Sequence, residues 1–396
     1  MEVKAGYKQT AAGLIPEDWD VKPYGEDLRL LSGQHVRASY ANSDGDGIPY
    51  LTGPSDFSGH VVHQTKYTNR PTTICRSGDI LITVKGSGTG TLAIADTDYC
   101  ISRQLIAIRA CNWDIRFIFY QLLWDTHYYE SCATGLIPGI SRSNILERKI
   151  SLPPLREQRA IAAALSDVDA LITALGRLIA KKRDIKQAAM QELLTGKRRL
   201  LGVDSRKSYK QTDVGIIPED WGEDCIRNLA SITTGAKNTE DKIEDGEFPL
   251  FVRSSTVERI NCYSFDGEAV LTAGDGVGTG KIFHYINGKF DFHQRVYMIN
   301  NFSKALMGYF FYLYFSNHFY SRIMSMTAKS SVDSVRMEMI ADMMIPLPPI
   351  HEQTAIATIL TDMDAELTAL EQKRDKTKAI KQGMMQELLT GRIRLV

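Results

Sequence analysis

Two long stretches of the chain carry apolar residues at alternating steps of four and three. The first stretch places them at Ile161, Leu165, Val168, Ile172, Leu175 and Ile179. The second stretch places them at Ile356, Leu360, Met363, Leu367 and Leu370, and its last seam position is Arg374. This spacing is typical of a helix whose apolar seam packs against a second helix. We therefore predict two long helices with a coiled-coil seam.

The ends of both predicted helices are marked in the sequence. Pro-Pro precedes each one, at residues 153–154 and 348–349, and Gly196 and Gly391 suit C-terminal caps. Glu157 and Glu352 fall in the first turns, where the helix dipole favours a carboxylate. The first helix should run over residues 156–195, which is roughly 60 Å of helix.

The helices belong to a tandem repeat. YKQTAAGLIPEDW at residues 7–19 returns as YKQTDVGIIPEDW at residues 209–221. LPPLREQ at residues 152–158 returns as LPPIHEQ at residues 347–353, and MQELLTG occurs at residues 190–196 and again at 385–391. Each half thus has a similar start and a similar end. If a two-fold axis perpendicular to the helices relates the halves, the two helices run antiparallel.

The segments between these similar ends differ, and both predict mixed α/β structure. Residues 77–96 and 266–285 alternate apolar and polar positions around a glycine turn, which indicates a hairpin. A further strand follows in each, with Gln104 opposite Gln294, and then an aromatic helical stretch. We predict an α+β fold of two tandem α/β recognition domains, residues 1–151 and 201–346. A pseudo-two-fold pair of antiparallel coiled-coil helices, residues 152–200 and 347–396, separates them.

Composition narrows the class of protein. The 396 residues carry 47 basic and 47 acidic side chains, so the net charge is zero, which argues mildly against a strongly basic nucleic-acid binder. The six cysteines and eight histidines lack metal-site spacing, and we expect no metal site. No apolar run approaches the roughly 20 residues of a membrane helix, and the first residues do not resemble a signal peptide. We expect a cytoplasmic protein.

Motifs for catalysis are missing from the sequence. GDGVGTGK at residues 274–281 departs from the phosphate-binding loop, because Asp275 stands where glycine is needed and Ile282 where Ser or Thr would bind magnesium. Both glycine-rich segments are more simply hairpin turns. We therefore expect no catalytic residue. The residues alone leave three hypotheses open: a DNA-recognition protein, a protein scaffold without DNA specificity, and a nuclease.

Polar and basic residues cluster around the glycine hairpins and are our candidate DNA contacts, because such side chains reach base edges and phosphates. They are Lys85, Ser87, Thr89, Arg103, Gln104 and Arg142 in the first half, and Lys281, His293, Gln294, Arg295, Lys329 and Arg336 in the second. Solvated surface charge is the alternative for each. The two glutamines could instead tie a strand to the glycine turn. The basic runs at residues 197–199 and 392–394 could be dipole-favoured helix ends or phosphate contacts.

This layout resembles the specificity subunit of Type I restriction–modification systems. The similarity rests on the doubled L-P-P-x-x-E-Q and MQELLTG motifs and on the doubled IPEDW segment, and it covers nearly the whole chain. It implies a non-catalytic subunit in which each variable domain recognises one half of a bipartite double-stranded DNA target. The paired helices would fix the spacer between the half-sites.

The same resemblance implies the partners. The helices would dock two DNA adenine methyltransferase subunits, and two motor-nuclease subunits would join the complex. S-adenosylmethionine, ATP and magnesium would be bound by those partners and not by this chain. The absence of catalytic motifs and of a strong net charge is then expected.

Overall fold

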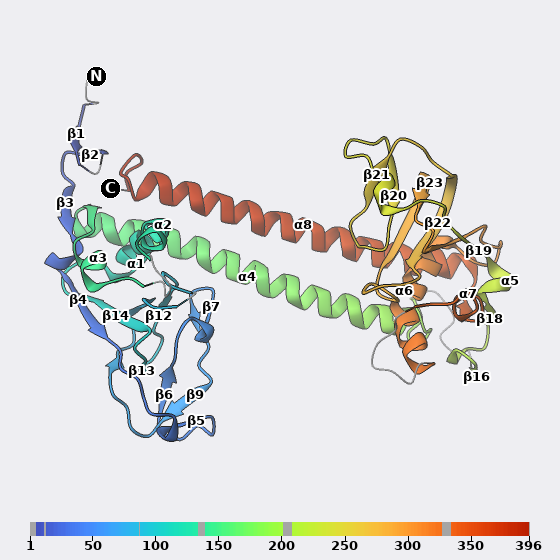
Figure 1. Ribbon diagram of the computed structural model, residues 1–396, viewed down its shortest axis with the longest axis horizontal. Coiled ribbons are helices and arrows are strands. Elements are labelled where there is room, and N and C mark those ends of the chain that lie inside the picture. Colours follow the sequence, from blue (N-terminus) through green and yellow to red (C-terminus); the bar gives the residue numbers. More distant parts are fainter. Residues whose placement is uncertain are drawn as a thin grey trace. The chain divides into compact units, whose positions relative to one another are not determined.

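The computed structural model describes residues 5–11, 13–86, 88–133, 139–200, 208–326 and 334–395. The chain divides into two compact units, unit 1 (Met1–Gly176 with Gln372–Val396) and unit 2 (Arg177–Glu371). Both boundaries fall inside long helices, so α4 (Leu155–Leu193) and α8 (Ile350–Leu388) each contribute one part to either unit. Figure 1 shows both helices as continuous ribbons. This grouping reflects packing, and the four-segment division of the sequence stays a prediction.

Unit 1 begins with the hairpin of β1 (Tyr7–Thr10) and β2 (Gly13–Pro16). The next strand, β3 (Asp20–Pro23), pairs with β15 (Lys149–Leu152), which leads directly into α4. The start of the unit is therefore tied to the residues that begin its long helix.

Among the described residues, two larger sheets and three short helices form the body of unit 1. The four-stranded sheet has the order β12 (Leu92–Ile94), β11 (Ile80–Thr83), β14 (Leu105–Ala110) and β4 (Leu28–Ser32). The five-stranded sheet has the order β10 (Ile74–Cys75), β13 (Tyr99–Ile101), β6 (Ile48–Leu51), β9 (Lys66–Thr68) and β5 (Ala41–Asn42). A small hairpin joins β7 (Phe57–Ser58) to β8 (Val61–Val62). The α-helices are α1 (Ile115–Trp124), α2 (Thr126–Cys132) and α3 (Arg142–Leu146), and the 3-10 turns are η1 (Tyr24–Glu26), η2 (Ala38–Tyr40) and η3 (Pro54–Asp56).

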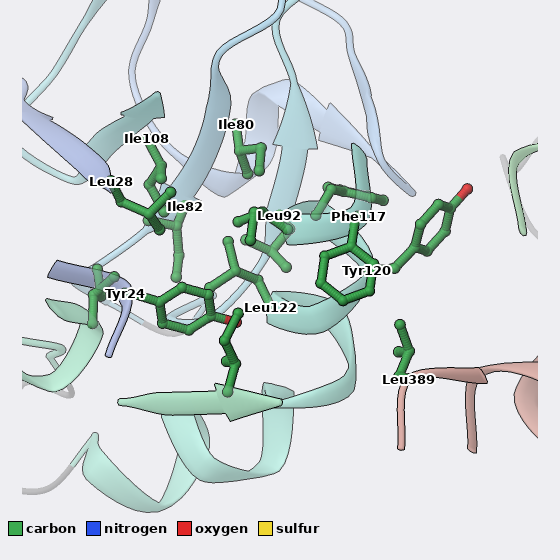
Figure 2. Packing of buried hydrophobic residues seen from close by; sticks show 14 of the residues in the cluster. Tyr24, Leu28, Ile80, Ile82, Leu92, Ile108, Phe117, Tyr120, Leu122 and Leu389 are labelled. Carbon is green, nitrogen blue, oxygen red and sulfur yellow. The ribbon is translucent and has the colours of Figure 1, made fainter. Parts of the chain in front are cut away.

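The main core of unit 1 lies between the four-stranded sheet, α1 and the ends of both long helices. Ile80 and Ile108 from the sheet and Phe117 from α1 are fully buried, and Leu389, directly after α8, packs in the same cluster. Figure 2 shows these side chains together with Tyr24 of η1. Burial of such apolar side chains is the dominant stabilising term for the unit.

Unit 2 repeats this arrangement with one larger sheet. Its hairpin is β16 (Tyr209–Thr212) with β17 (Gly215–Pro218), and β18 (Gly222–Cys225) pairs with β25 (Met344–Leu347) just before α8. The six-stranded sheet has the order β19 (Ser231–Thr234), β24 (Val296–Asn300), β22 (Phe265–Ala273), β23 (Phe283–Phe292), β20 (Phe248–Phe251) and β21 (Glu258–Ile260). Its helices are α5 (Ile226–Leu229), α6 (Gly308–Ser325) and α7 (Met337–Ala341), with the 3-10 turn η4 (Thr239–Asp241).

The two long helices are paired and antiparallel within each unit. In unit 1, Lys381 of α8 lies 2.7 Å from the Asp169 carboxylate of α4. In unit 2, Lys186 and Lys182 of α4 lie 2.5 and 2.7 Å from Asp364 and Glu366 of α8. In each pair, residues later in one helix meet residues earlier in the other. The predicted fold class, two tandem α/β domains with an antiparallel pair of long helices, is confirmed.

The predicted seam is the face that the helices bury. Ile161, Leu165, Leu175 and Ile179 of α4 are all buried. On α8, Ile356, Leu360 and Leu367 are buried. The hairpins predicted around the glycine turns are the pairs β11–β12 and β22–β23. The heptad period and the alternation at strand spacing therefore identified these elements correctly.

Candidate nucleic-acid interface and the frame that carries it

A buried carboxylate holds together the repeated motifs of unit 1. Glu157, from the L-P-P-x-x-E-Q motif, is 2% exposed and accepts a hydrogen bond from the Trp19 indole nitrogen at 3.0 Å. Arg394, near the end of the chain, donates to Glu157 at 2.7 Å and to Asp18 at 2.7 Å. The hydrogen bond to Glu157 raises the pKa of Arg394 above its usual value. The hydrogen bond from Arg394 lowers the pKa of Asp18 below its usual value. Three motifs that are far apart in the sequence thus meet at one ion-pair cluster.

Unit 2 contains the same cluster made from the other copies of the motifs. Glu352 is 1% exposed and accepts from the Trp221 indole nitrogen at 3.0 Å. Arg199 donates to Glu352 at 2.7 Å and to Asp220 at 2.9 Å. The end of the first sequence repeat therefore packs on the start of the second, and the end of the second packs on the start of the first.

The glycine of each MQELLTG motif packs closely against the IPEDW segment of the other repeat. Gly391 has a φ of +73°, and a Cβ placed there would lie 2.5 Å from Pro16 Cδ. Gly196 has a φ of +69°, and its Cβ would lie 2.5 Å from Pro218 Cδ. Only glycine combines this backbone conformation with so close an approach. The motif occurs twice because each unit needs one such contact between a helix end and an IPEDW segment.

The glutamine of L-P-P-x-x-E-Q ties each long helix to its domain. The Gln158 side chain accepts from Asp114 N at 2.8 Å, just before α1, and donates to Pro153 O at 2.9 Å. Gln353 accepts from Met307 N at 2.8 Å, just before α6, and donates to Pro348 O at 2.7 Å. Both glutamines are buried, and both satisfy backbone groups that would otherwise be unpaired. The basic runs after the helices were expected to act as dipole-favoured ends or phosphate contacts, whereas Arg199 and Arg394 instead form the ion-pair clusters.

The glycine turn of unit 1 brings several predicted residues together. Lys85 is exposed and lies in a bridge to Gly139, and the Thr89 hydroxyl donates to Gly86 O at 2.6 Å within the turn. Val84 N donates to Gln104 O at 2.8 Å, which places the exposed Gln104 beside the turn. The turn and the start of β14 therefore form one polar surface.

A cleft of about 460 Å³ adjoins this surface. Two of the candidate contacts, Arg103 and Gln104, line it together with Lys66 of β9 and His35. Lys66 and His35 were not among the predicted residues. Gly33 lies two residues before His35, and a Cβ there would lie 2.1 Å from Ser102 O. This close approach is visible only in the fold, so no signal in the sequence indicated Lys66 or His35.

Arg142 lies at the start of α3 and has a structural partner. Its guanidinium donates to Leu30 O at 3.1 Å and to the Ser32 hydroxyl at 3.0 Å. The side chain remains exposed. Arg142 therefore stabilises the end of β4 through these hydrogen bonds.

In unit 2 the acidic residue of the turn joins two arginines. Asp275 accepts from Arg253 Nη1 at 3.0 Å and from Arg295 Nη1 at 2.8 Å. Arg295 is a predicted contact and its side chain is 62% exposed, whereas the Asp275 side chain is 18% exposed. Arg253 was missed because it lies in a loop after β20 that has no glycine or charge pattern of its own.

His293 differs from the other predicted contacts because it is buried. Its Nδ1 accepts from Arg295 N at 2.9 Å. Burial, and then the neighbouring guanidiniums of Arg253 and Arg295, lower the pKa of His293. A neutral ring with an accepting Nδ1 supports the turn before β24, so we assign His293 a supporting position and not a place on the surface.

The remaining predicted residues of unit 2 surround the same turn. The Gln294 side chain donates to Asn238 Oδ1 at 2.6 Å, so it does not tie the strand to the glycine turn through its amide. Lys281 lies 5.0 Å from the centre of the Tyr320 ring, and Arg336 is exposed directly before α7. Ser87 and Lys329 lie outside the described residues.

Among residues 5–11, 13–86, 88–133, 139–200, 208–326 and 334–395, no group of His, Cys, Asp and Glu has the arrangement of a metal site. Within those ranges, no helix is both long and apolar enough to cross a membrane.

Two units of one architecture, each with a polar glycine turn that joins two antiparallel strands, define a tandem recognition protein built on an internal repeat. The family of the Type I restriction modification DNA specificity domain matches twice, over residues 16–182 and 218–381. The chain therefore belongs to this family and carries two copies of its domain.

Curated relatives and a solved structure agree with this assignment. The chain is 27% identical to the Type I restriction enzyme MjaVIII specificity subunit of Methanocaldococcus jannaschii, over 98% of this chain and 96% of that protein. It is 24% identical to the putative MjaX specificity subunit of the same organism, over 98% and 97%. The crystal structure of the S subunit from M. genitalium matches over 98% of both chains at 16% identity, with a TM-score of 0.63, and supports the fold.

Membership in this family establishes the function class. The chain is a DNA sequence-specificity subunit of a Type I restriction–modification complex, and catalysis resides in the partner subunits. The scaffold hypothesis without DNA specificity is not supported, and the nuclease hypothesis is not needed.

Proposed function

We propose that each unit reads one half of a bipartite double-stranded DNA target through the surface around its glycine turn. In unit 1 this surface contains Lys85, Thr89, Arg103 and Gln104, with Lys66 and His35 on the adjoining cleft. In unit 2 it contains Lys281, Gln294, Arg295 and Arg336, joined by Arg253. Arg, Lys and Gln can bind both phosphates and base edges, and base edges carry the sequence information.

One observation carries this proposal. The two turns have the same backbone anchoring but different exposed side chains. Val84 N donates to Gln104 O at 2.8 Å in unit 1, and Gly274 N donates to Arg295 O at 2.8 Å in unit 2. The threonine hydroxyl of each turn donates to the first glycine carbonyl at 2.6 Å. Two domains that recognise different half-sites need this combination of a shared backbone and different exposed side chains.

The same proposal covers the partners. Two adenine methyltransferase subunits would dock on the paired helices and the frame, and two motor-nuclease subunits would complete the restriction enzyme. S-adenosylmethionine, ATP and magnesium would bind to those subunits. The complex would act on DNA in the cytoplasm. A chain with zero net charge fits this arrangement, because the partners can supply part of the positive surface that faces the phosphates.

A domain exchange tests whether each unit recognises one half-site. Residues 32–151 are replaced by the corresponding segment of another family member, and the hybrid is expressed with its adenine methyltransferase. Sequencing of the methylated adenines should show one half-site changed and the other retained. If the whole recognition sequence changes or is lost while the complex still assembles, reading by separate units is wrong.

A further inference from the structure

The glycine turns of the two units differ in sequence at two positions. The turn of unit 2 has Asp275 and Val277 where the turn of unit 1 has Lys85 and Ser87. Lys85 is an exposed cation, whereas Asp275 is mostly covered by two arginines. Val277 follows Gly276, which has a φ of +86°, and its side chain is fully exposed. A fully exposed valine at the tip of a turn is held there by the backbone and not by packing.

The turn that carries Val277 is anchored on three sides. Gly274 N donates to Arg295 O, and Val335 N donates to Gly274 O at 2.7 Å. Gly278 packs against the loop of Arg253, since a Cβ there would lie 3.2 Å from Arg253 O. Thr279 N donates to Gly276 O at 3.0 Å. The position of Val277 relative to Arg253 and Arg295 is therefore fixed by backbone contacts.

We propose that Asp275 is a positioning residue that holds Arg253 and Arg295 for the reading of base edges, and that Val277 contacts the methyl group of a thymine beside them. This inference rests on the proposed function, namely that unit 2 reads DNA. It adds Asp275 and Val277 to that surface, gives Arg253 and Arg295 a role in reading bases, and names the base that Val277 would contact.

The charges of the cluster favour bases over phosphates as its target. The carboxylate cancels one of the two guanidinium charges and would repel a phosphate group brought close to it. It also fixes two long side chains before DNA arrives, which lowers the entropy lost on binding. A fixed guanidinium suits guanine, and an apolar side chain suits the C5-methyl of thymine. Lys85, in contrast, is an exposed cation of the kind that contacts phosphates.

The Val277 contact is tested with the complex of this chain and its adenine methyltransferase. Each thymine of the second half-site is replaced in turn by deoxyuridine, which lacks only the methyl group, and the dissociation constant is measured. One replacement should weaken binding by the wild-type complex about fourfold, the effect of losing one buried methyl. The same replacement should leave binding by Val277→Ser unchanged. Ile243→Ala, an exposed apolar residue of the same unit, should keep the wild-type response.

The role of Asp275 is tested with Asp275→Asn and Lys85→Ala. Asp275→Asn should lower discrimination against wrong bases about tenfold at one or two positions of the second half-site. It should also strengthen binding to non-specific DNA at low salt, because a negative charge is lost. Lys85→Ala should weaken binding to all sequences and reduce the salt dependence.

Recognition of the unchanged first half-site reports that Asp275→Asn, Val277→Ser and Ile243→Ala fold and assemble, because all three changes lie in unit 2. The inference is overturned if Asp275→Asn and Val277→Ser keep the wild-type preferences in the second half-site, and the proposed function then still stands. If the wild-type complex shows no preference in the second half-site, the proposed function itself is wrong.

Discussion

At the scale of single residues, the stability of each unit depends on the side chains of its ion-pair cluster. Glu157 is buried and receives both the Trp19 indole and the Arg394 guanidinium. Removing one partner of a buried ion pair leaves a charge without compensation, which costs far more than the net value of the intact pair. The stability of unit 1 therefore depends on the single side chain of Arg394.

Replacement of Arg394 by methionine tests this dependence. We expect the free energy of unfolding of unit 1 to fall by about 3 kcal/mol, because Glu157 loses its cation. Arg392→Met is the matched control, since Arg392 is exposed and pairs with Glu387 at 3.5 Å, and it should cost less than about 0.5 kcal/mol. Urea unfolding of both variants provides the comparison. Equal midpoints for the two variants would contradict the account.

A second buried carboxylate links stability to pH. Asp27 accepts hydrogen bonds from Cys111 N, Asn112 N and Trp113 N at 2.9, 2.7 and 3.0 Å. Burial alone would raise its pKa, but these bonds and the Asn112 amide lower the pKa of Asp27 below its usual range. A carboxylate with a lowered folded pKa stabilises the protein above its unfolded pKa, about 3.9. That contribution is lost as the pH falls through the folded value.

Asp27→Asn should therefore flatten the pH dependence of unfolding. Between about pH 6 and pH 2 the stability of the wild type should fall more steeply than that of Asp27→Asn. Asp44→Asn, which changes an exposed carboxylate of the same unit, should keep the wild-type slope. Thermal unfolding measured across this pH range would show the difference, and parallel curves for all three proteins would exclude the assigned role of Asp27.

At the scale of elements, the MQELLTG glycine closes each helix onto the opposite repeat's IPEDW segment. Gly391→Ala should destabilise unit 1 by about 2 kcal/mol, because alanine disfavours the positive φ and its Cβ meets Pro16. Gly383 lies within α8, and a Cβ there would meet nothing within 4 Å. Gly383→Ala should therefore stabilise the protein by about 0.5–1 kcal/mol. Calorimetric melting temperatures that shift in the same direction for both variants would contradict this.

The elements were predictable because their signals are periodic and local. The seam from Ile161 to Ile179 and the glycine hairpins predicted α4, β11–β12 and β22–β23 at the right places. The ion-pair clusters were not predicted, because they join residues such as Asp18, Glu157 and Arg394 that only the tertiary fold brings together. Arg253 was missed for the same reason. It follows β20 and contacts Asp275, which follows β22, and no sequence pattern connects these two positions.

At the scale of the whole molecule, α4 and α8 are the only helices that pass from one unit to the other, as far as the described residues extend. We expect their length to set the number of unread base pairs between the half-sites. Seven residues added to both helices, after Gly176 and after Glu371, would keep the heptad seam in register. They would lengthen each helix by about 10 Å, which corresponds to about three base pairs.

Methylation-site sequencing of this insertion variant should show a spacer longer by about three base pairs and both half-sites unchanged. A control variant with seven residues added after Glu244, in the exposed loop between η4 and β20, should keep the wild-type spacer. An unchanged spacer in the helix variant, with methylation retained, would mean that the helices do not set the distance.

The most direct measurement is the sequencing of adenines methylated by the wild-type chain with its methyltransferase. The account predicts one asymmetric recognition sequence, made of two different half-sites separated by a fixed number of unread base pairs. The two half-sites should differ because the exposed residues of the two turns differ, as with Lys85 and Asp275. Methylation without sequence preference, or at one continuous short sequence, would contradict it.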